Sequence, residues 1–207
     1  MKTLLFILCI IIIGCVPRSL VISYYRTIPP DSLYFPVGTA AFDSIGYFDN
    51  QKCSTCLSVL KEPILFKDSS SKEIYRVTLL GSFPPMIIRL ELDSGNAFLY
   101  AKQAKGNEPL YADSIDVNET RRLTTEPWEE FVVRQHQIPF WELPKPVKPS
   151  FLIRGGGLIM YIVEGKNQQG YHVVCATNFT YEDCLWETVM SLLEIHGLEN
   201  HAFNQLK

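Results

Sequence analysis

The sequence predicts an α+β fold in which a single antiparallel sheet of about six strands packs against about three helices. Three observations support this prediction. Six segments have the composition and alternation of strands, three others repeat apolar residues at helical spacing, and turn residues separate neighbouring strands closely enough for hairpins. Strands joined by hairpins form antiparallel sheets, and a helix with one apolar stripe must bury that stripe. We therefore expect one sheet covered by a helical layer.

The first element of the domain is a helix that begins at Asp49 or Asn50 and reaches about Lys61. Asp and Asn side chains accept hydrogen bonds from the N–H groups of a first helical turn, and Pro63 cannot continue the helix. Four apolar residues at helical spacing predict its buried side. They are Cys53, Cys56, Leu57 and Leu60.

Four strand-like segments follow this helix. Within residues 87–92 polar residues alternate with apolar ones, which predicts one buried and one solvent-facing side. The tetrapeptide Asp93-Ser94-Gly95-Asn96 is typical of a turn between paired strands. The four segments are residues 73–80, 86–92, 97–104 and about 110–117.

A second helix is expected from about Glu126 to Gln137, capped by Thr124 or Thr125. Pro127 is tolerated there because the N–H groups of a first turn have no acceptor within the helix. The residues expected on its inner face are Trp128, Phe131, Val132 and Gln135.

Two further strands and a third helix complete the predicted domain. The strands lie near residues 158–163 and 170–176, joined by residues 164–169. The third helix opens at Thr180, where Asp183 completes a capping box, and reaches about His196. Its expected buried residues are Leu185, Val189, Leu192 and Leu193.

The N-terminal fifteen residues are typical of a secretory signal peptide, because Lys2 precedes an apolar run over residues 4–13. The motif Ile12-Ile13-Gly14-Cys15 is similar to the lipobox of bacterial lipoproteins. This resemblance implies that residues 1–14 are removed and that Cys15 becomes a lipidated mature N-terminus carrying three acyl chains. The apolar stretch is shorter than the roughly 20 residues of a membrane span. Plain secretion or an uncleaved anchor is the alternative.

The remaining chain divides into a lipidated N-terminus and tether, residues 15–48, and a single α+β domain, residues 49–207. Proline residues exclude a long helix from the tether. Part of the tether is nevertheless expected to lie against the domain, because it is too apolar for a solvated linker. The residues concerned are Tyr24, Tyr25, Leu33, Tyr34 and Phe35.

The charge of the mature chain is mildly acidic. Removing residues 1–14, which contain one Lys, leaves 18 basic and 22 acidic residues and a net charge of −4. No basic cluster is present, which argues against a nucleic-acid partner. The expected partners are the membrane, through the N-terminal lipid, and an envelope protein or wall component. Residues 16–19 lack an acidic export signal, so we expect attachment to the cell membrane or outer membrane with the domain facing the periplasm.

Four cysteines remain besides Cys15, and their spacing favours Cys53 with Cys56 and Cys175 with Cys184 as candidate disulfides. Two other interpretations remain open. Cys53 and Cys56 have the spacing of a thiol redox motif, although no strand precedes them, and a zinc site would need a second close pair. Simple burial on the helix also explains both residues.

Short motifs are spread over about two thirds of the chain, between residues 62 and 198. They are Tyr75-Arg76, Ser82-Phe83, Ile88-Arg89-Leu90-Glu91, Trp128-Glu129-Glu130-Phe131, Phe140-Trp141-Glu142-Leu143-Pro144, Glu164-Gly165 and Gly170-Tyr171-His172-Val173-Val174. With these motifs the stretch resembles an uncharacterised family of bacterial, Bacteroidetes-like envelope lipoproteins. The resemblance implies one compact domain and the lipobox, and it implies no mechanism. The chain departs from the family pattern at residues 155–158 and 175–177.

The sequence assigns no catalytic, cofactor-binding or metal-binding residue. The four histidines form no ligand motif, and only His172 lies on a predicted strand, where a hydrogen-bonded structural role explains it best. We therefore expect a non-enzymatic binding or structural module of the envelope. The alternative is a periplasmic enzyme, a hydrolase or a thiol redox protein, that uses His172 or the pair Cys53 and Cys56.

Overall fold

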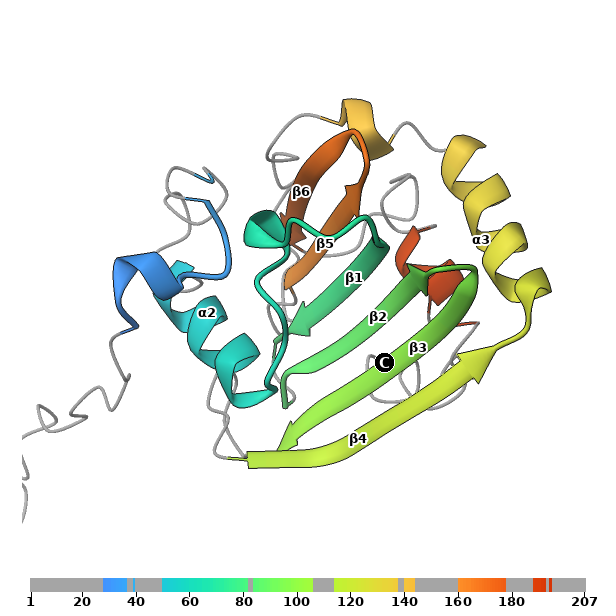
Figure 1. Cartoon of the computed structure of the whole chain (residues 1–207). Helices are drawn as coiled ribbons and strands as arrows, with labels where there is room; N and C mark the ends of the chain where they lie inside the picture. Colours follow the sequence, from blue (N-terminus) through green and yellow to red (C-terminus); the bar gives the residue numbers. More distant parts are fainter. Residues whose placement is uncertain are drawn as a thin grey trace, which may run out of the picture.

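A computed structural model describes residues 28–36, 39, 50–81, 84–105, 114–137, 140–143, 160–177, 188–192 and 194. It has an α+β fold built on one six-stranded antiparallel sheet with the strand order β4-β3-β2-β1-β5-β6 (Figure 1). Successive hairpins extend the sheet from β1 to β4, and the chain then crosses to the other side of β1 to add β5 and β6. The strands are β1 (Glu73–Leu80), β2 (Met86–Asp93), β3 (Asn96–Lys105), β4 (Ser114–Leu123), β5 (Met160–Asn167) and β6 (Gly170–Thr177).

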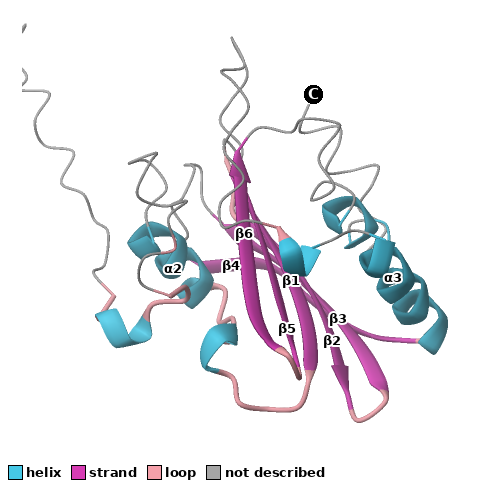
Figure 2. Cartoon of the chain, turned by 90° about the horizontal axis from the view of Figure 1, so that it is seen from above, coloured by secondary structure: helices cyan, strands magenta, loops and turns pink. Residues whose placement is uncertain are grey.

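Helices cover both faces of the sheet (Figure 2). Helix α2 (Asn50–Val59) packs on one face, which we call the α2 face. Helix α3 (Thr125–Gln137) packs on the other, the α3 face, together with helical residues 188–192 and the short helix η3 (Phe140–Glu142). The expectation of one helical layer was therefore incomplete. The central strands require two layers because they are buried on both sides, as seven of the eight residues of β1 are.

Each face of the sheet has its own hydrophobic core. On the α3 face, Trp128 and Phe131 of α3 contact Tyr75 of β1, and Val77 and Leu79 belong to the same cluster. On the α2 face, the helix buries the four residues that its periodicity predicted, Cys53, Cys56, Leu57 and Leu60. The apolar stripes of both helices were thus correctly read from helical spacing.

Two strands extend further than their apolar patterns indicated. Strand β4 continues to Leu123, although alternation of apolar residues stops at Val117, because the rest of the strand pairs with β3 while staying exposed. Strand β5 continues to Asn167, through residues that we had expected in a connection. It can do so because Glu164 and Lys166 are buried beside partners of opposite charge.

Residues 28–36 lie against α2, as their apolar character led us to expect. The side-chain amide of Gln51 exchanges two hydrogen bonds with the backbone of Ile28, both 3.0 Å. The backbone N–H of Tyr34 donates to Ser54 Oγ at 2.9 Å. Tyr24, Tyr25, Cys15 and the first half of the expected third helix lie outside the described residues. Among the described residues, no helix is long and apolar enough to cross a membrane.

Candidate functional site

The most concentrated polar chemistry of the described chain is an ion network buried on the α2 face, between the sheet and the segment that follows α2. It holds three cations and three anions, so it is electrically balanced. We call this set the buried ion network. Its members are Arg76, Arg89, Lys102, Glu62, Glu91 and Glu164.

Glu62 is the centre of the network. One oxygen, Oε2, accepts from Arg89 Nε at 3.0 Å and from Arg76 Nη1 at 3.4 Å. The other, Oε1, lies 2.7 Å from Lys102 Nζ. Burial alone would raise the pKa of Glu62, but the charges of Arg76, Arg89 and Lys102 outweigh it and hold that pKa below its ordinary range.

Arg76 and Glu164 form the deepest pair of the network, on neighbouring strands in direct register. Arg76 donates from Nε to Glu164 Oε2 at 2.7 Å and from Nη1 to the backbone carbonyl of Pro63 at 2.8 Å. The Tyr171 hydroxyl donates to Glu164 Oε1 at 2.9 Å. Burial raises the pKa of Glu164, and Arg76 opposes this only in part. Neither side chain of the pair is exposed to solvent.

The outer part of the network reaches the surface through Glu91. Arg89 donates to Glu91, and its guanidinium lies over the Tyr100 ring, 3.8 Å from the centroid. Glu91 also accepts from Lys72 at 2.7 Å, and the Lys72 side chain is one third exposed. Arg89, Glu91 and Lys72 therefore form a chain of alternating charges that leads from the buried network to solvent.

The inner members of this network are enclosed by the protein, which favours a structural role for them. A perturbed carboxyl pKa is characteristic of active sites, but a reacting group must also be reachable by a substrate. The side chains of Arg76, Glu62 and Glu164 are fully buried. Arg76 joins Glu62 and Pro63, which follow α2, to strand β1, and its pair with Glu164 joins β1 to β5.

Three thiols lie in the same hydrophobic core as α2. Cys53 and Cys56 of α2 and Cys175 of β6 are buried and are not joined by a disulfide. The Cys53–Cys56 disulfide that the spacing favoured is thus not formed in this structure, because both residues lie on the buried stripe of a regular helix. Burial raises the pKa of the Cys56 thiol to about 12 and also raises that of Cys175. Cys184 lies outside the described residues, so its pairing with Cys175 stays a prediction.

His172 lies on the opposite, α3 face of the sheet, among aromatic rings. Its ring centroid is 5.2 Å from that of Phe140 and 6.2 Å from that of Trp141. On the neighbouring strand it faces Gly165, whose missing side chain makes room for these rings. The residues of the enzyme hypothesis therefore do not share a site, because the sheet separates His172 from Cys53 and Cys56. Among the described residues, no group of His, Cys, Asp and Glu side chains could hold a metal ion.

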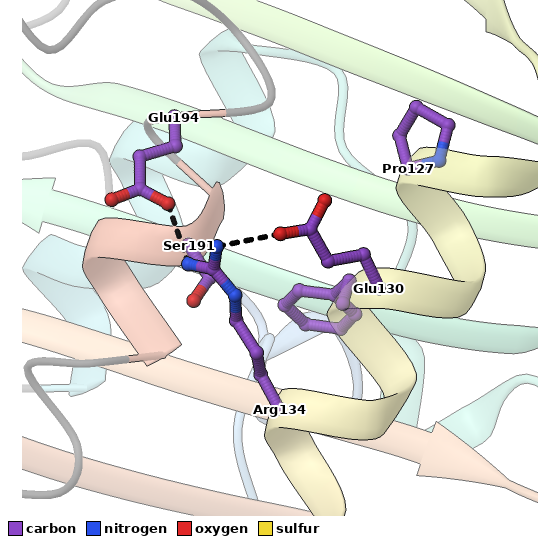
Figure 3. Close-up of a pocket in the computed structure, with 6 residues that line it drawn as sticks. Pro127, Glu130, Arg134, Ser191 and Glu194 are labelled. Carbon is purple, nitrogen blue, oxygen red and sulfur yellow. Dashed lines mark hydrogen bonds and ion pairs between the residues drawn. The ribbon is translucent and has the colours of Figure 1, made fainter.

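Three hollows lie on the surface of the described residues. In one of about 200 Å³ between α3 and residues 191–194, Arg134 already binds Glu130 and Glu194, each at 2.6 Å (Figure 3). Two larger hollows, of about 430 and 340 Å³, flank the β2–β3 turn and share Leu92 and Gly95. Hydroxyl and amide groups dominate the polar lining of both, which suits hydrogen bonding to a ligand.

Sequence reasoning missed the buried ion network. The alternation that Arg89 and Glu91 create in β2 predicts a solvent-facing side, whereas both residues are buried. One signal was available: Arg76 lies inside a mainly apolar strand, where a buried charge requires a partner of opposite charge. A comparison with protein-family models gave no match, and a search of curated proteins also gave none.

Proposed function

We propose that this chain is a lipid-anchored protein of the bacterial cell envelope, attached through Cys15, whose domain faces the periplasm and acts without catalysis. In this role it binds an envelope protein or wall component, or serves a structural purpose. The observation that carries the proposal is the sequence Ile12-Ile13-Gly14-Cys15 at the end of a basic and then apolar N-terminus.

The position of residues 28–36 supports an anchored arrangement. Twelve residues separate Cys15 from Ile28, so the Cα atoms of Cys15 and Ile28 are at most about 45 Å apart. Ile28 is held by Gln51 of α2. An anchor at Cys15 would therefore keep Ile28, and the α2 helix that holds it, within about 45 Å of the membrane.

The state of the reactive groups supports a role without catalysis. The carboxylates with shifted pKa values are engaged by cations inside the protein. The Cys56 thiol, with a pKa of about 12, is a poor nucleophile at neutral pH. His172 packs against Phe140 and Trp141. The polar hollows beside the β2–β3 turn are the better candidates for contact with a partner.

Metabolic labelling with a clickable fatty acid tests the anchor. The wild-type chain should be labelled and should sediment with membranes, whereas Cys15→Ala should lose the label and leave the membrane fraction. Cys9→Ala is a matched control, because Cys9 lies within the same apolar segment and should keep the label. Equal labelling of Cys15→Ala and the wild type would refute the proposal.

A further inference from the structure

Strand β4 is an exposed edge of the sheet. In the described part of the chain it pairs with β3 alone, and seven of its ten residues are exposed. The opposite edge strand differs, because Val173, Val174 and Cys175 of β6 are buried. An exposed edge presents unpaired backbone N–H and C=O groups and is the usual place for another strand to add.

A β-bulge limits the part of β4 that can form a regular ladder. Ala104 is opposite Ile115 and Gln103 is opposite Val117, so Asp116 is the extra residue of the bulge. From Val117 to Leu123 the register with β3 is unbroken. The regular segment therefore contains seven residues, and Thr120 is its middle.

We propose that two copies of this chain associate through antiparallel pairing of their β4 strands, centred on Thr120. If the regular segments overlap fully, each Thr120 faces Thr120 of the other copy. In that register Glu119 of each copy faces Arg121 of the other, and Val117 faces Leu123. Two pairs of opposite charge and two apolar pairs thus follow from full overlap of the segments between the bulge and the end of β4.

Side-chain exposure agrees with this register. Glu119, Thr120 and Arg121 are exposed, whereas Val117 and Leu123 at the ends are half-buried. Opposite charges that face each other across antiparallel strands stabilise the pairing, and like charges weaken it. The paired segment of each copy carries Glu119, Arg121 and Arg122, and each Arg122 faces the uncharged Asn118 of the other copy, so no like charges are directly opposite each other.

The symmetry of the pairing turns the same face of the sheet to the same side in both copies. A twofold axis that relates antiparallel edge strands of one continuous sheet is perpendicular to that sheet. Both α2 faces therefore lie on one side of the combined sheet, and so do both segments 28–36. The pairing does not depend on the lipid anchor, but it would allow two anchors to enter one membrane.

Disulfide trapping tests the register on the full-length chain in mild detergent. Thr120→Cys should form a disulfide-linked dimer on mild oxidation, because opposite residues lie within disulfide reach. Asn118→Cys is the matched control: it is equally exposed, but its two copies would be four residues, or about 14 Å, apart along the strands. The wild-type chain, oxidised in parallel, gives the background from the native thiols.

Charge exchange tests the contacts that define the pairing. Glu119→Arg alone or Arg121→Glu alone places like charges opposite each other at two symmetric positions, which should weaken dimerisation about 30-fold in sedimentation velocity. The double variant Glu119→Arg/Arg121→Glu restores opposite charges and should return the dissociation constant to near the wild-type value. Unchanged circular dichroism would show that the single variants still fold.

Three results would overturn the inference. The first is a wild-type chain that stays monomeric at every accessible concentration and shows no trapping at Thr120→Cys. The second is a dimer whose stability does not respond to either single charge exchange. The third is a disulfide from Thr120→Cys to a different polypeptide, which would assign the edge to another partner.

Discussion

Glu62 forms ion pairs with cations from three neighbouring strands: Arg76 of β1, Arg89 of β2 and Lys102 of β3. Its own position is fixed by the segment that leaves α2. The backbone carbonyl of Glu62 accepts from the Tyr34 hydroxyl at 2.8 Å, so the segment 28–36 is connected to the same residue. Glu62 is therefore the residue that joins the N-terminal segment, the turn after α2 and the sheet.

Removing this charge should be costly. Glu62→Gln leaves buried cations without their shared anion, and breaking a buried ion pair in this way costs about 3–5 kcal/mol of unfolding free energy. The matched control is Glu130→Gln, which removes a partner of Arg134 at the surface and should change stability by no more than about 0.5 kcal/mol. Urea unfolding of both variants measures the difference, and equal small losses would contradict the role given to Glu62.

The same residue predicts how stability depends on pH. The pKa of Glu62 in the folded protein lies below its ordinary value of 4.5, so the unfolded chain takes up this proton first as the pH falls. The stabilisation by Glu62 is therefore complete above about pH 4.5 and is lost as the pH falls through the folded pKa. As the pH is lowered, the free energy of unfolding should therefore fall less steeply in Glu62→Gln than in the wild type.

These contacts explain why sequence reasoning found the strand but not its chemistry. A period of two in β2 is the same whether Arg89 and Glu91 face water or face buried partners. Glu62 is 14 residues from Arg76 and 27 from Arg89, so nothing local marks them as partners. By contrast, the buried stripe of α2 was predictable because helical spacing is local.

At the scale of elements, the aromatic rings of η3 pack closely against β5 at Gly165, which has no side chain. A methyl group at Gly165 would lie 2.5 Å from Phe140 Cε1 and 3.1 Å from Trp141 Cη2. Tyr75 on the neighbouring strand has ring contacts with both aromatic residues, each with centroids 6.3 Å apart. The motifs Phe140-Trp141 and Glu164-Gly165, which carry part of the family resemblance, thus meet in one contact.

This contact predicts that Gly165→Ala is destabilising. The added methyl group must displace a packed aromatic ring, and such overpacking costs about 1–3 kcal/mol. Phe140→Leu removes the closest clashing atom, so the double variant Gly165→Ala/Phe140→Leu should lose less stability than the sum of the single losses. Thermal and urea unfolding of the three variants would measure this coupling, and strictly additive losses would contradict the proposed clash.

The elements differ in how well the sequence could predict them. The bounds of β1 and the apolar face of α3 were predictable, because apolar residues mark both. The last seven residues of β4 were not fully predictable, since an exposed edge strand needs no apolar alternation and is defined by pairing with β3. The same exposure of this edge is what makes β4 available to a second strand in the pairing that we propose.

At the scale of the whole molecule, the sheet separates two different interiors. The α2 face contains the buried ion network, the three thiols and the contacts of residues 28–36, whereas the α3 face contains the aromatic cluster with His172. The network and the thiols share the α2 face, yet both are enclosed there. In the function that we propose, the polar interior stabilises the fold, and the lipid anchor and the surface of the domain make the contacts with the envelope.

We propose that the buried thiols and carboxylates of the described residues take no part in chemistry, and alkylation of the thiols with iodoacetamide tests this proposal. With a Cys56 pKa of about 12 and both α2 thiols enclosed, Cys53 and Cys56 of the reduced, full-length chain should react slowly at and below neutral pH. Peptide mapping should find them labelled at a useful rate only when denaturant unfolds the domain, in step with the unfolding transition. Fast labelling of Cys53 in the folded chain below neutral pH would contradict the account and would favour a thiol enzyme.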